Sequence, residues 1–277
     1  MSTNITLANG VEMPSLGLGT WLIEAHDLDR VVKLALDTGY TLFDTAQAYE
    51  TEQELGQALS NTPREDLFLV SKVWNSHHGY YQTLEAFEQT LERLNTNYLD
   101  SYMIHWPCPK LNKWQDTWQA LEYVYSRGYT RTIGVSNFNP NQLDQLLEHA
   151  NIRPHILQTE LHPLWQQTLL RELCDRYSIH VQASRPFAHG QLLDSLEYCK
   201  LASELDIAPT DLAVRWTLAQ GCSLVPRSTS STHLALNWRA QYSTLDASVV
   251  EQVNQLYRHC QLQTGDDSRD MHRGCHL

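Results

Sequence analysis

The sequence predicts an α/β protein of the (β/α)8 TIM barrel class, with an N-terminal β-hairpin at the barrel bottom. Short apolar, β-favouring runs recur eight times along the 277 residues, and amphipathic helical stretches separate most of them. Apolar strands that alternate with helices indicate parallel pairing, with both faces of the sheet covered. The length is large for an ordinary domain but normal for such a barrel. A doubly wound open sheet is the alternative that fits the same pattern.

The expected strands and helices follow one another along the whole chain. The predicted strands cover residues 15–20, 41–45, 67–73, 101–106, 131–137, 156–161, 179–184 and 222–228. Apolar residues at helical spacing predict helices over residues 27–39, 80–94, 116–128, 141–150, 166–177 and 209–221. Three tryptophans on these helices are expected to pack against the outside of the sheet: Trp114, Trp118 and Trp216. Since no linker interrupts the pattern, residues 1–277 are predicted to form one barrel domain.

The two ends of the chain lie outside the repeating pattern. Near the N-terminus, Asn9-Gly10 stands between two short extended segments, so residues 1–12 are predicted to form a hairpin with a type I′ turn. This hairpin is expected to close one end of the barrel. Residues 262–277 are polar and aperiodic, and we expect a tail or a loop over one barrel face.

The composition of the chain limits the kinds of partner that the protein can bind and the cellular compartment in which it is expected. The formal net charge is -12, from 20 basic and 32 acidic residues, which argues against a surface for nucleic acid or anionic membranes. The N-terminus is polar and lacks the apolar core of a signal peptide, and no apolar run is long enough to span a membrane. The six cysteines include no C-x-x-C pair, so they are interpreted as reduced thiols of a cytoplasmic protein.

Polar residues stand at the ends of three neighbouring predicted strands. Asp44 ends the second strand, Lys72 the third and His105 the fourth, while Tyr49 lies in the loop behind Asp44. The carboxyl ends of barrel strands meet around one mouth, where the chemistry of such barrels takes place. A buried carboxylate without a partner is costly, so Lys72 is the expected cation for Asp44. Taken singly, each residue also has an ordinary structural explanation, such as a stabilising ion pair or a packed imidazole.

Taken together, the four side chains suit the protonation of a carbonyl oxygen. A phenol has a pKa near 10, and a nearby ammonium group is expected to lower the pKa of Tyr49. An imidazole beside the phenol can hydrogen-bond to a substrate oxygen. A carbonyl group that accepts a proton on oxygen must accept a hydride on carbon, and protein side chains supply no hydride. The set therefore implies a nicotinamide cofactor.

Several segments of the chain resemble the aldo-keto reductase family, in particular its small bacterial aldehyde, ketone and diketo-gluconate reductase-like members. The similar segments, in order, are LGLGTW, GYTLFDTAQAYETEQELG, LFLVSKVWN, SYMIHWP, TIGVSNF, QTELHP and VPRS. The resemblance implies that Tyr49 is the proton donor and that Lys72 and Asp44 adjust its pKa. It further implies that His105 orients the substrate carbonyl. It also implies a cofactor extended across the barrel mouth, in agreement with the absence of a G-x-G-x-x-G motif after the first strand.

The same resemblance implies the binding residues. Ser136, Asn137 and Gln158 are expected to hold the nicotinamide carboxamide, with Gly19 and Thr20 beside the cofactor. Arg227, Ser228 and Asn237 are expected at the adenosine end, with Arg227 at the 2′-phosphate of NADP(H). The residues expected to line the substrate pocket are Trp21, Trp74, Trp106 and His78. No metal site is expected: His77 and His78 lack an evident third ligand, and the histidines and cysteine of the last residues are assigned to the tail.

Three positions depart from the family pattern. Ser184 stands where an aromatic residue usually stacks on the nicotinamide, which removes about 1 kcal/mol of stacking. Arg185 stands where serine is usual, and we hypothesise that it clamps the cofactor pyrophosphate. His233 stands where an arginine usually binds the 2′-phosphate, so the preference for NADP(H) over NAD(H) is expected to be weakened.

The predicted function is NAD(P)H-dependent reduction of a small aldehyde or ketone by a cytoplasmic monomer, without nucleic-acid or membrane partners. Two alternatives stay open. The same barrel could bind a nucleotide in a regulatory or structural role without carbonyl turnover, because fold does not determine function. The Ser184 and Arg185 pair could instead serve a specialised biosynthetic reductase with an unusual substrate.

Overall fold

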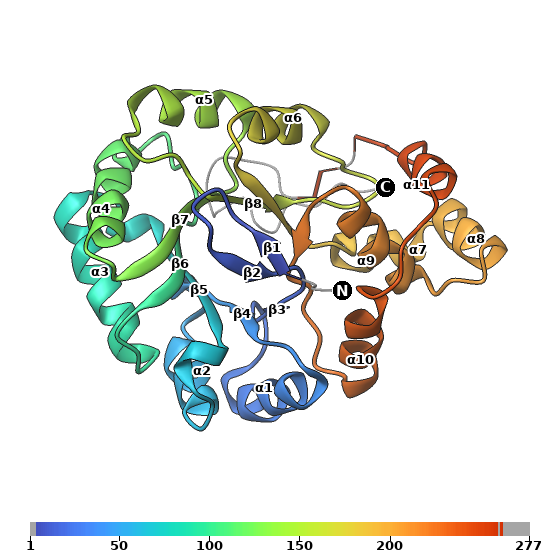
Figure 1. Ribbon diagram of the computed structural model, residues 1–277, viewed down its shortest axis with the longest axis horizontal. Helices are drawn as coiled ribbons and strands as arrows, with labels where there is room; N and C mark the ends of the chain where they lie inside the picture. Colours follow the sequence, from blue (N-terminus) through green and yellow to red (C-terminus); the bar gives the residue numbers. More distant parts are fainter. Residues whose placement is uncertain (1–3, 260, 263–277) are drawn as a thin grey trace.

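A ring of eight parallel strands forms the centre of the protein (Figure 1). The computed structural model describes residues 4–259 and 261–262. Neighbouring strands pair in chain order, and the ring closes through a parallel bridge between Leu16 and Leu224. This closure confirms the predicted barrel and excludes the doubly wound open sheet. The strands are β3 (Leu18–Gly19), β4 (Leu42–Asp44), β5 (Phe68–Val73), β6 (Leu99–Ile104), β7 (Thr130–Ser136), β8 (Ile156–Glu160), β9 (His180–Ser184) and β10 (Ser223–Leu224).

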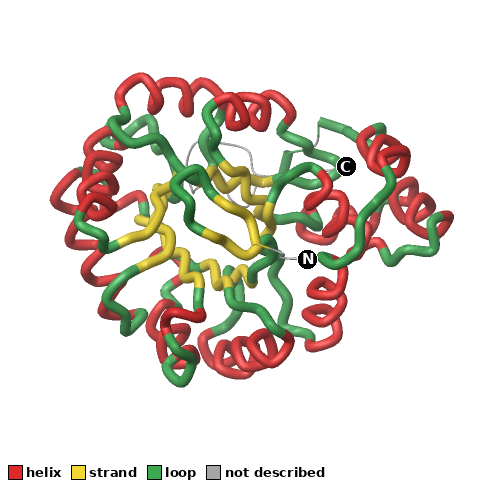
Figure 2. Tube along the Cα trace, in the orientation of Figure 1, coloured by secondary structure: helices red, strands yellow, loops and turns green. Residues whose placement is uncertain are grey.

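Helices cover the outside of this ring, as Figure 2 shows. The predicted helices are present as α1 (Ala25–Thr38), α3 (Tyr80–Arg93), α4 (Trp114–Ser126), α5 (Pro140–His149), α6 (Thr168–Arg176) and α9 (Pro209–Ala219). The helices that the sequence reasoning did not predict are α2 (Glu52–Leu59), α7 (Gln191–Asp194), α8 (Leu196–Glu204), α10 (Ser231–Ala240) and α11 (Ala247–Asn254). These five have four to ten residues, and their apolar residues do not form a clear helical period in the sequence, whereas those of the similarly short α5 and α6 do. The expected outer packing of Trp118 and Trp216 is confirmed, since both are buried in the outer core that Trp114 also contacts.

Two apolar cores lie on either side of the strands. The larger one fills the space between the strands and the helices. The smaller one fills the barrel interior and consists of Leu7, Met13, Leu42, Phe68, Val70, Met103, Ile156 and Val225. Because side chains alternate between the two faces of a strand, the residue two positions after an interior residue also faces inward. The residues placed in this way at the carboxyl ends of the strands are Asp44, Lys72, His105 and Gln158.

An N-terminal hairpin closes the opposite end of the barrel, as predicted. Strands β1 (Asn4–Thr6) and β2 (Glu12–Pro14) pair antiparallel, and Met13 is fully buried in the barrel interior. The predicted type I′ turn was wrong. Leu7 accepts a hydrogen bond from the Gly10 backbone N–H at 2.8 Å, and Gly10 has a positive φ of 81° whereas Asn9 has none. The connection is therefore a longer turn with its left-handed residue at Gly10, which is common in hairpins with more than two loop residues.

The segment around Leu262 lies at the end of the barrel that is formed by the carboxyl ends of the strands. The Leu262 N–H donates to Glu160 Oε1, at the end of β8, over 2.7 Å. The rest of the tail predicted over residues 262–277 lies outside the described residues, as do Cys260 and Cys275. Among the described residues, Cys174, Cys199 and Cys222 take part in no disulfide. Within the described part of the chain, no helix is long and apolar enough to cross a membrane, and no group of three potential ligands could hold a metal ion.

Candidate active site

A cavity of about 340 Å³ opens at the carboxyl ends of the strands. The predicted site residues that line it are Gly19, Trp21, Asp44, Tyr49, His105, Trp106, Ser136, Asn137, Gln158, Ser184, Arg185 and Arg227. The predicted site residues outside its lining are Thr20, Lys72, Trp74, His78, Ser228, His233 and Asn237. The tertiary structure thus gathers residues from most strand ends into one site, as the barrel topology requires.

Asp44 and Lys72 form a buried ion pair beneath the cavity. Lys72 Nζ lies 2.7 Å from Asp44 Oδ1 and 2.8 Å from Oδ2, and it donates to the Thr45 carbonyl at 2.9 Å. The side chains are 0% and 4% exposed, respectively. These three bonds use all three N–H donors of the ammonium group. Asp44 Oδ2 also accepts a hydrogen bond of 2.7 Å from Gln158, so both charges are compensated.

Glu52 at the start of α2 adds a second negative charge near Lys72. It accepts hydrogen bonds from Ser71 Oγ at 2.5 Å and from Arg93 Nε at 2.7 Å. Burial lowers the pKa of Lys72, while Asp44 and Glu52 oppose that effect. The two carboxylates thus favour the charged form of this ammonium group against the cost of burial.

Tyr49 lies above this pair, at the end of a short 3₁₀ helix (η1, Gln47–Tyr49). Lys72 Nζ is 5.6 Å from the centroid of its ring. Burial raises the pKa of Tyr49 and Asp44 raises it further, while Arg185 lowers it. The pKa of this phenol is therefore raised overall, and burial outweighs the lowering that was expected from the Lys72 ammonium. The reason is that Asp44 and the Thr45 carbonyl occupy the lysine's donors, and burial disfavours the phenolate.

His105 stands directly after β6, between two aromatic rings. Its ring centroid is 5.6 Å from that of Tyr49 and 5.3 Å from that of Trp74, both in edge-to-face arrangements. Burial lowers the pKa of His105 well below its usual range, and the charges of Lys72 and Arg185 add to this. The ring is therefore neutral near pH 7, and a neutral imidazole offers one N–H donor. Trp74 contacts the His105 ring and is not among the residues that line the cavity.

Another wall of the cavity consists of three polar side chains: Ser136 at the end of β7, Asn137 directly after it, and Gln158 on β8. Asn137 Nδ2 donates to the His105 carbonyl at 2.9 Å and to Ser136 Oγ at 3.0 Å. Gln158 Nε2 donates to Asp44 Oδ2 and to Gln182 Oε1, both at 2.7 Å. Because both amide nitrogens are used in this way, the carbonyl oxygens of Asn137 and Gln158 are the groups that they can offer to a ligand.

Ser184 and Arg185 lie at the end of β9, on the side of Trp21. Arg185 has a positive φ of 50°. Its Nε donates to His189 Nε2 at 2.8 Å, and its guanidinium carbon lies 5.1 Å from the ring centroid of Trp21. Burial lowers the pKa of Arg185, while Glu160 and Tyr49 raise it. Arg185 lines the same cavity as Tyr49 and His105.

The residues predicted for the adenosine end lie farther out. Arg227 is exposed and donates to the Leu22 carbonyl at 3.1 Å. Ser228 Oγ bonds the backbone of Ser230 at 3.2 Å and 3.4 Å, His233 is exposed near the N-terminus of α10, and Asn237 is buried on the same helix. Thr20, also outside the cavity lining, donates from Oγ1 to the Asp44 carbonyl at 3.0 Å.

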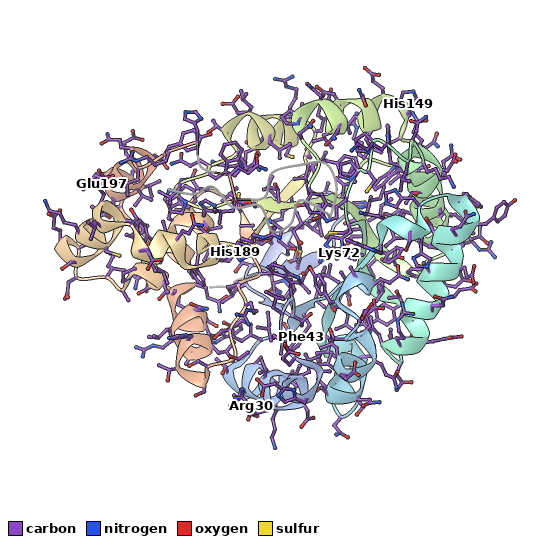
Figure 3. All side chains as sticks on the ribbon, turned by 180° about the vertical axis from the view of Figure 1, so that it is seen from behind. Arg30, Phe43, Lys72, His149, His189 and Glu197 are labelled. Atoms are coloured by element: carbon purple, nitrogen blue, oxygen red, sulfur yellow. The ribbon has the colours of Figure 1, made fainter. Side chains whose placement is uncertain are left out.

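The sequence reasoning missed three polar residues at or near this site, of which His189 and Arg30 are labelled in Figure 3. It also missed the cavity-lining residues Leu22, Pro186, Phe187, Gly190, Leu193 and Val225. Gln182 precedes Ser184 by two positions on β9, so strand alternation could have found it. His189 reaches Arg185 only because the intervening loop contains left-handed residues, which the sequence does not indicate. Arg30 on α1 donates from Nη1 and Nη2 to the Thr229 carbonyl, each at 3.2 Å, and this contact across 199 residues leaves no local signal.

Comparison with known proteins assigns the chain to a family. The family model described as the aldo/keto reductase family matches residues 15–258. The chain belongs to the aldo-keto reductase family. It is thus an oxidoreductase, and the predicted resemblance is confirmed.

The relatives of this aldo-keto reductase include named enzymes. It is 42% identical to an aldo-keto reductase of Mycolicibacterium smegmatis, over 86% of this chain and 87% of the relative. It is also 42% identical to the glyoxal reductase of Bacillus subtilis, over 82% of this chain and 83% of the relative. Among solved structures, an aldo-keto reductase from a Medee basin deep-sea metagenome library has a TM-score of 0.90 and 34% identity, covering 95% of this chain and 98% of that one. A mutant of Gox0644 in complex with NADPH has a TM-score of 0.89 and 33% identity, covering 93% and 94%.

Proposed function

We propose that this aldo-keto reductase reduces a small aldehyde or ketone to an alcohol with a nicotinamide cofactor. The observation that carries the proposal is the arrangement of Tyr49 and a neutral His105 above the buried Asp44–Lys72 pair, within one cavity. A neutral imidazole can hold a carbonyl oxygen beside the phenol, and the phenol is protonated at pH 7 because burial raises its pKa.

The cavity wall suits the nicotinamide carboxamide. The carbonyl oxygens of Asn137 and Gln158 can accept its two N–H groups. The Ser136 hydroxyl accepts a hydrogen bond from Asn137 and so can donate its own proton to the carboxamide oxygen. Support for the cofactor class also comes from Gox0644, a relative whose mutant was crystallised with NADPH.

The chain's residues would act together in the transfer. A bound reduced nicotinamide supplies the hydride to the carbonyl carbon. His105 would orient the carbonyl oxygen, and Tyr49 would give its phenolic proton to that oxygen as negative charge develops on it. The Lys72 ammonium, 5.6 Å from the Tyr49 ring centroid, would stabilise the phenolate that forms, and Asp44 would hold the ammonium in place. The bonds between Asp44, Lys72 and Gln158 link this proton-transfer site to the carboxamide wall.

The proposed cofactor preference is NADP(H), weakened relative to a site with two phosphate-binding arginines. Arg227 is the proposed phosphate cation, and His233, exposed nearby in chain order, stands where a second guanidinium group would be usual. Arg30 places a further guanidinium beside Thr229, although it is paired with Asp27 at 2.6 Å. A cytoplasmic location and a monomeric state stay predictions, and light scattering tests the second.

The experiment that tests the function combines binding and turnover. The purified protein is titrated with NADPH and NADH while tryptophan fluorescence is followed, and carbonyl reduction is then measured for the wild type and for Tyr49→Phe. We expect saturable binding and a fall in kcat of at least about 100-fold in the variant, with the cofactor Kd nearly unchanged. The control is Tyr81→Phe, since Tyr81 is 79% exposed on α3.

Two results would contradict the proposal. Equal turnover by Tyr49→Phe and the wild type would remove Tyr49 as the proton donor. Cofactor binding without reduction of any carbonyl compound would favour a regulatory or structural role for the barrel. That role is the alternative that the changes at Ser184 and His233 suggest.

A further inference from the structure

Gln182 on β9 is a fully buried glutamine that lies outside the lining of the catalytic cavity. It is the register partner of Gln158 on β8, so both side chains point to the same, inner face of the sheet. Among the described residues, its amide nitrogen has the Met13 sulfur as acceptor at 3.9 Å, and a thioether is a weak acceptor. A buried amide with so weak a partner costs free energy that an apolar side chain of similar size would not cost. Packing alone therefore does not explain a glutamine at this position.

The carbonyl oxygen of Gln182 accepts a short hydrogen bond from the cavity wall. Gln158 Nε2 donates to Gln182 Oε1 and to Asp44 Oδ2, both at 2.7 Å. These two bonds use both N–H groups of the Gln158 amide. A single bond to Asp44 would leave the amide free to rotate about that bond, whereas two anchors define the plane of the amide.

The second anchor decides which atoms Gln158 can offer to a ligand. Gln158 lines the cavity, and with both N–H groups held, its carbonyl oxygen is the group that remains for hydrogen bonding there. Without Gln182, the second N–H group would be free to turn into the cavity and donate. A ligand group that donates would then lose its advantage over a group that only accepts.

We propose that Gln182 is a positioning residue, which holds Gln158 so that the site selects the nicotinamide carboxamide by its N–H groups. This proposal rests on the reductase function and on the carboxamide wall proposed above. Gln182 acts through Gln158 and has no contact of its own with the cofactor, because it lies outside the cavity lining.

The alternative is that Gln182 serves the fold alone, as a bridge between the hairpin residue Met13 and β8. The two roles predict different results for an apolar replacement of similar size. A structural bridge loses stability when it is removed. A positioning residue can be replaced without such a loss, because the buried Gln182 amide is gone and the freed Gln158 N–H can turn toward the cavity.

The test compares NADPH with its reduced 3-acetylpyridine analogue, whose acetyl group keeps the carbonyl oxygen and lacks the N–H groups. The ratios of the two Kd values and of the two kcat/KM values are measured in the wild type, Gln182→Met and Gln182→Glu. Because every protein is given the same two cofactors, their intrinsic difference in hydride transfer cancels. We expect Gln182→Met to reduce the preference for NADPH about 3- to 10-fold, the range of one hydrogen bond, with the midpoint of urea unfolding unchanged or raised.

Two further variants separate the acceptor from the fold. Gln182→Glu should keep the wild-type preference, because burial favours its protonated form, whose carbonyl oxygen accepts the same bond. Gln166 is the matched control, a buried glutamine outside the catalytic cavity, whose Nε2 donates to the carbonyls of Pro163 and Asn254 at 3.0 Å and 2.8 Å. Gln166→Met should lower the urea midpoint and leave the cofactor preference unchanged.

Other outcomes would overturn the inference in distinguishable ways. An unchanged preference in a folded Gln182→Met protein that still reduces a carbonyl compound would refute the positioning role and leave the reductase function intact. Failure of Gln182→Met to fold would assign Gln182 to the fold, and an equal loss of preference in Gln182→Glu would show that its acceptor oxygen does not hold Gln158. Failure of the wild type to bind either cofactor, or to reduce any carbonyl compound, would refute the underlying function and the inference with it.

Discussion

Replacing Lys72 by methionine should strongly destabilise the protein, because it leaves the Asp44 carboxylate buried without its cation. The two side chains are 0% and 4% exposed, and Lys72 Nζ lies within 2.8 Å of both carboxylate oxygens. In the variant, Asp44 keeps one side-chain donor among the described residues, the Gln158 amide. Breaking one half of a buried ion pair costs about 3–5 kcal/mol.

The assay is urea unfolding of the wild type, Lys72→Met and the double variant Asp44→Asn/Lys72→Met. Removing both charges should return the free energy of unfolding to within about 2 kcal/mol of the wild type, because no unpaired buried charge is left. Carbonyl reduction should stay low in both variants, since the cation beneath Tyr49 is absent. The double variant would thus regain most of the lost stability without regaining carbonyl reduction.

A surface ion pair gives the matched control. Lys200 and Glu204 lie 3.7 Å apart on α8 and are 78% and 60% exposed. Lys200→Met should change the free energy of unfolding by less than about 0.5 kcal/mol. If Lys72→Met unfolded at the same urea concentration as the wild type, the reasoning about the buried pair would be refuted.

Two further predictions concern the cofactor and the pH dependence of stability. His233→Arg should raise the preference for NADPH over NADH at least about tenfold, because a permanent charge joins Arg227 at the proposed phosphate site, and equal affinity ratios in the two proteins would exclude His233 from that site. His78 is 2% exposed, and burial, followed by the charge of Lys113, lowers its pKa to about 4. Its neutral form therefore contributes stability fully above pH 6.5, which is lost as the pH falls toward 4, by up to about 3 kcal/mol. His78→Gln should flatten the plot of unfolding free energy against pH in this window, and a plot parallel to that of the wild type would contradict the assignment.

Much of the fold could be predicted because the signals are local. Each barrel strand is an apolar run, and each of the six predicted helices has an apolar face, so the order of these elements follows from periodicity alone. The other five helices, of four to ten residues, showed no apolar period clear enough to predict them. The turn at Gly10 was mispredicted because Asn-Gly is compatible with more than one hairpin connection.

The candidate site was predictable for a similar reason. The residues Asp44, Lys72 and Gln158 stand on the interior face at the carboxyl ends of their strands, and His105 directly follows its strand, so the barrel topology brings them together. Gln182 shares that face. The pKa of Tyr49, in contrast, depends on which atoms the Lys72 ammonium actually bonds, and those partners lie up to 28 residues away in the chain.

The sequence by itself determined the alternation of parallel strands and helices, the polar residues at the strand ends and the chemistry that these side chains can perform, because periodicity and residue type are local properties; the closure of the strands into a barrel was decided by the tertiary structure. Only the tertiary structure decided that the Lys72 ammonium group donates its hydrogen bonds to Asp44 and Thr45. The same holds for the contacts of Arg185 with Trp21 and His189 in the cavity. These features arise from long-range contacts and left-handed loop residues. Their energies depend on burial and distance, which exist only once the chain has folded.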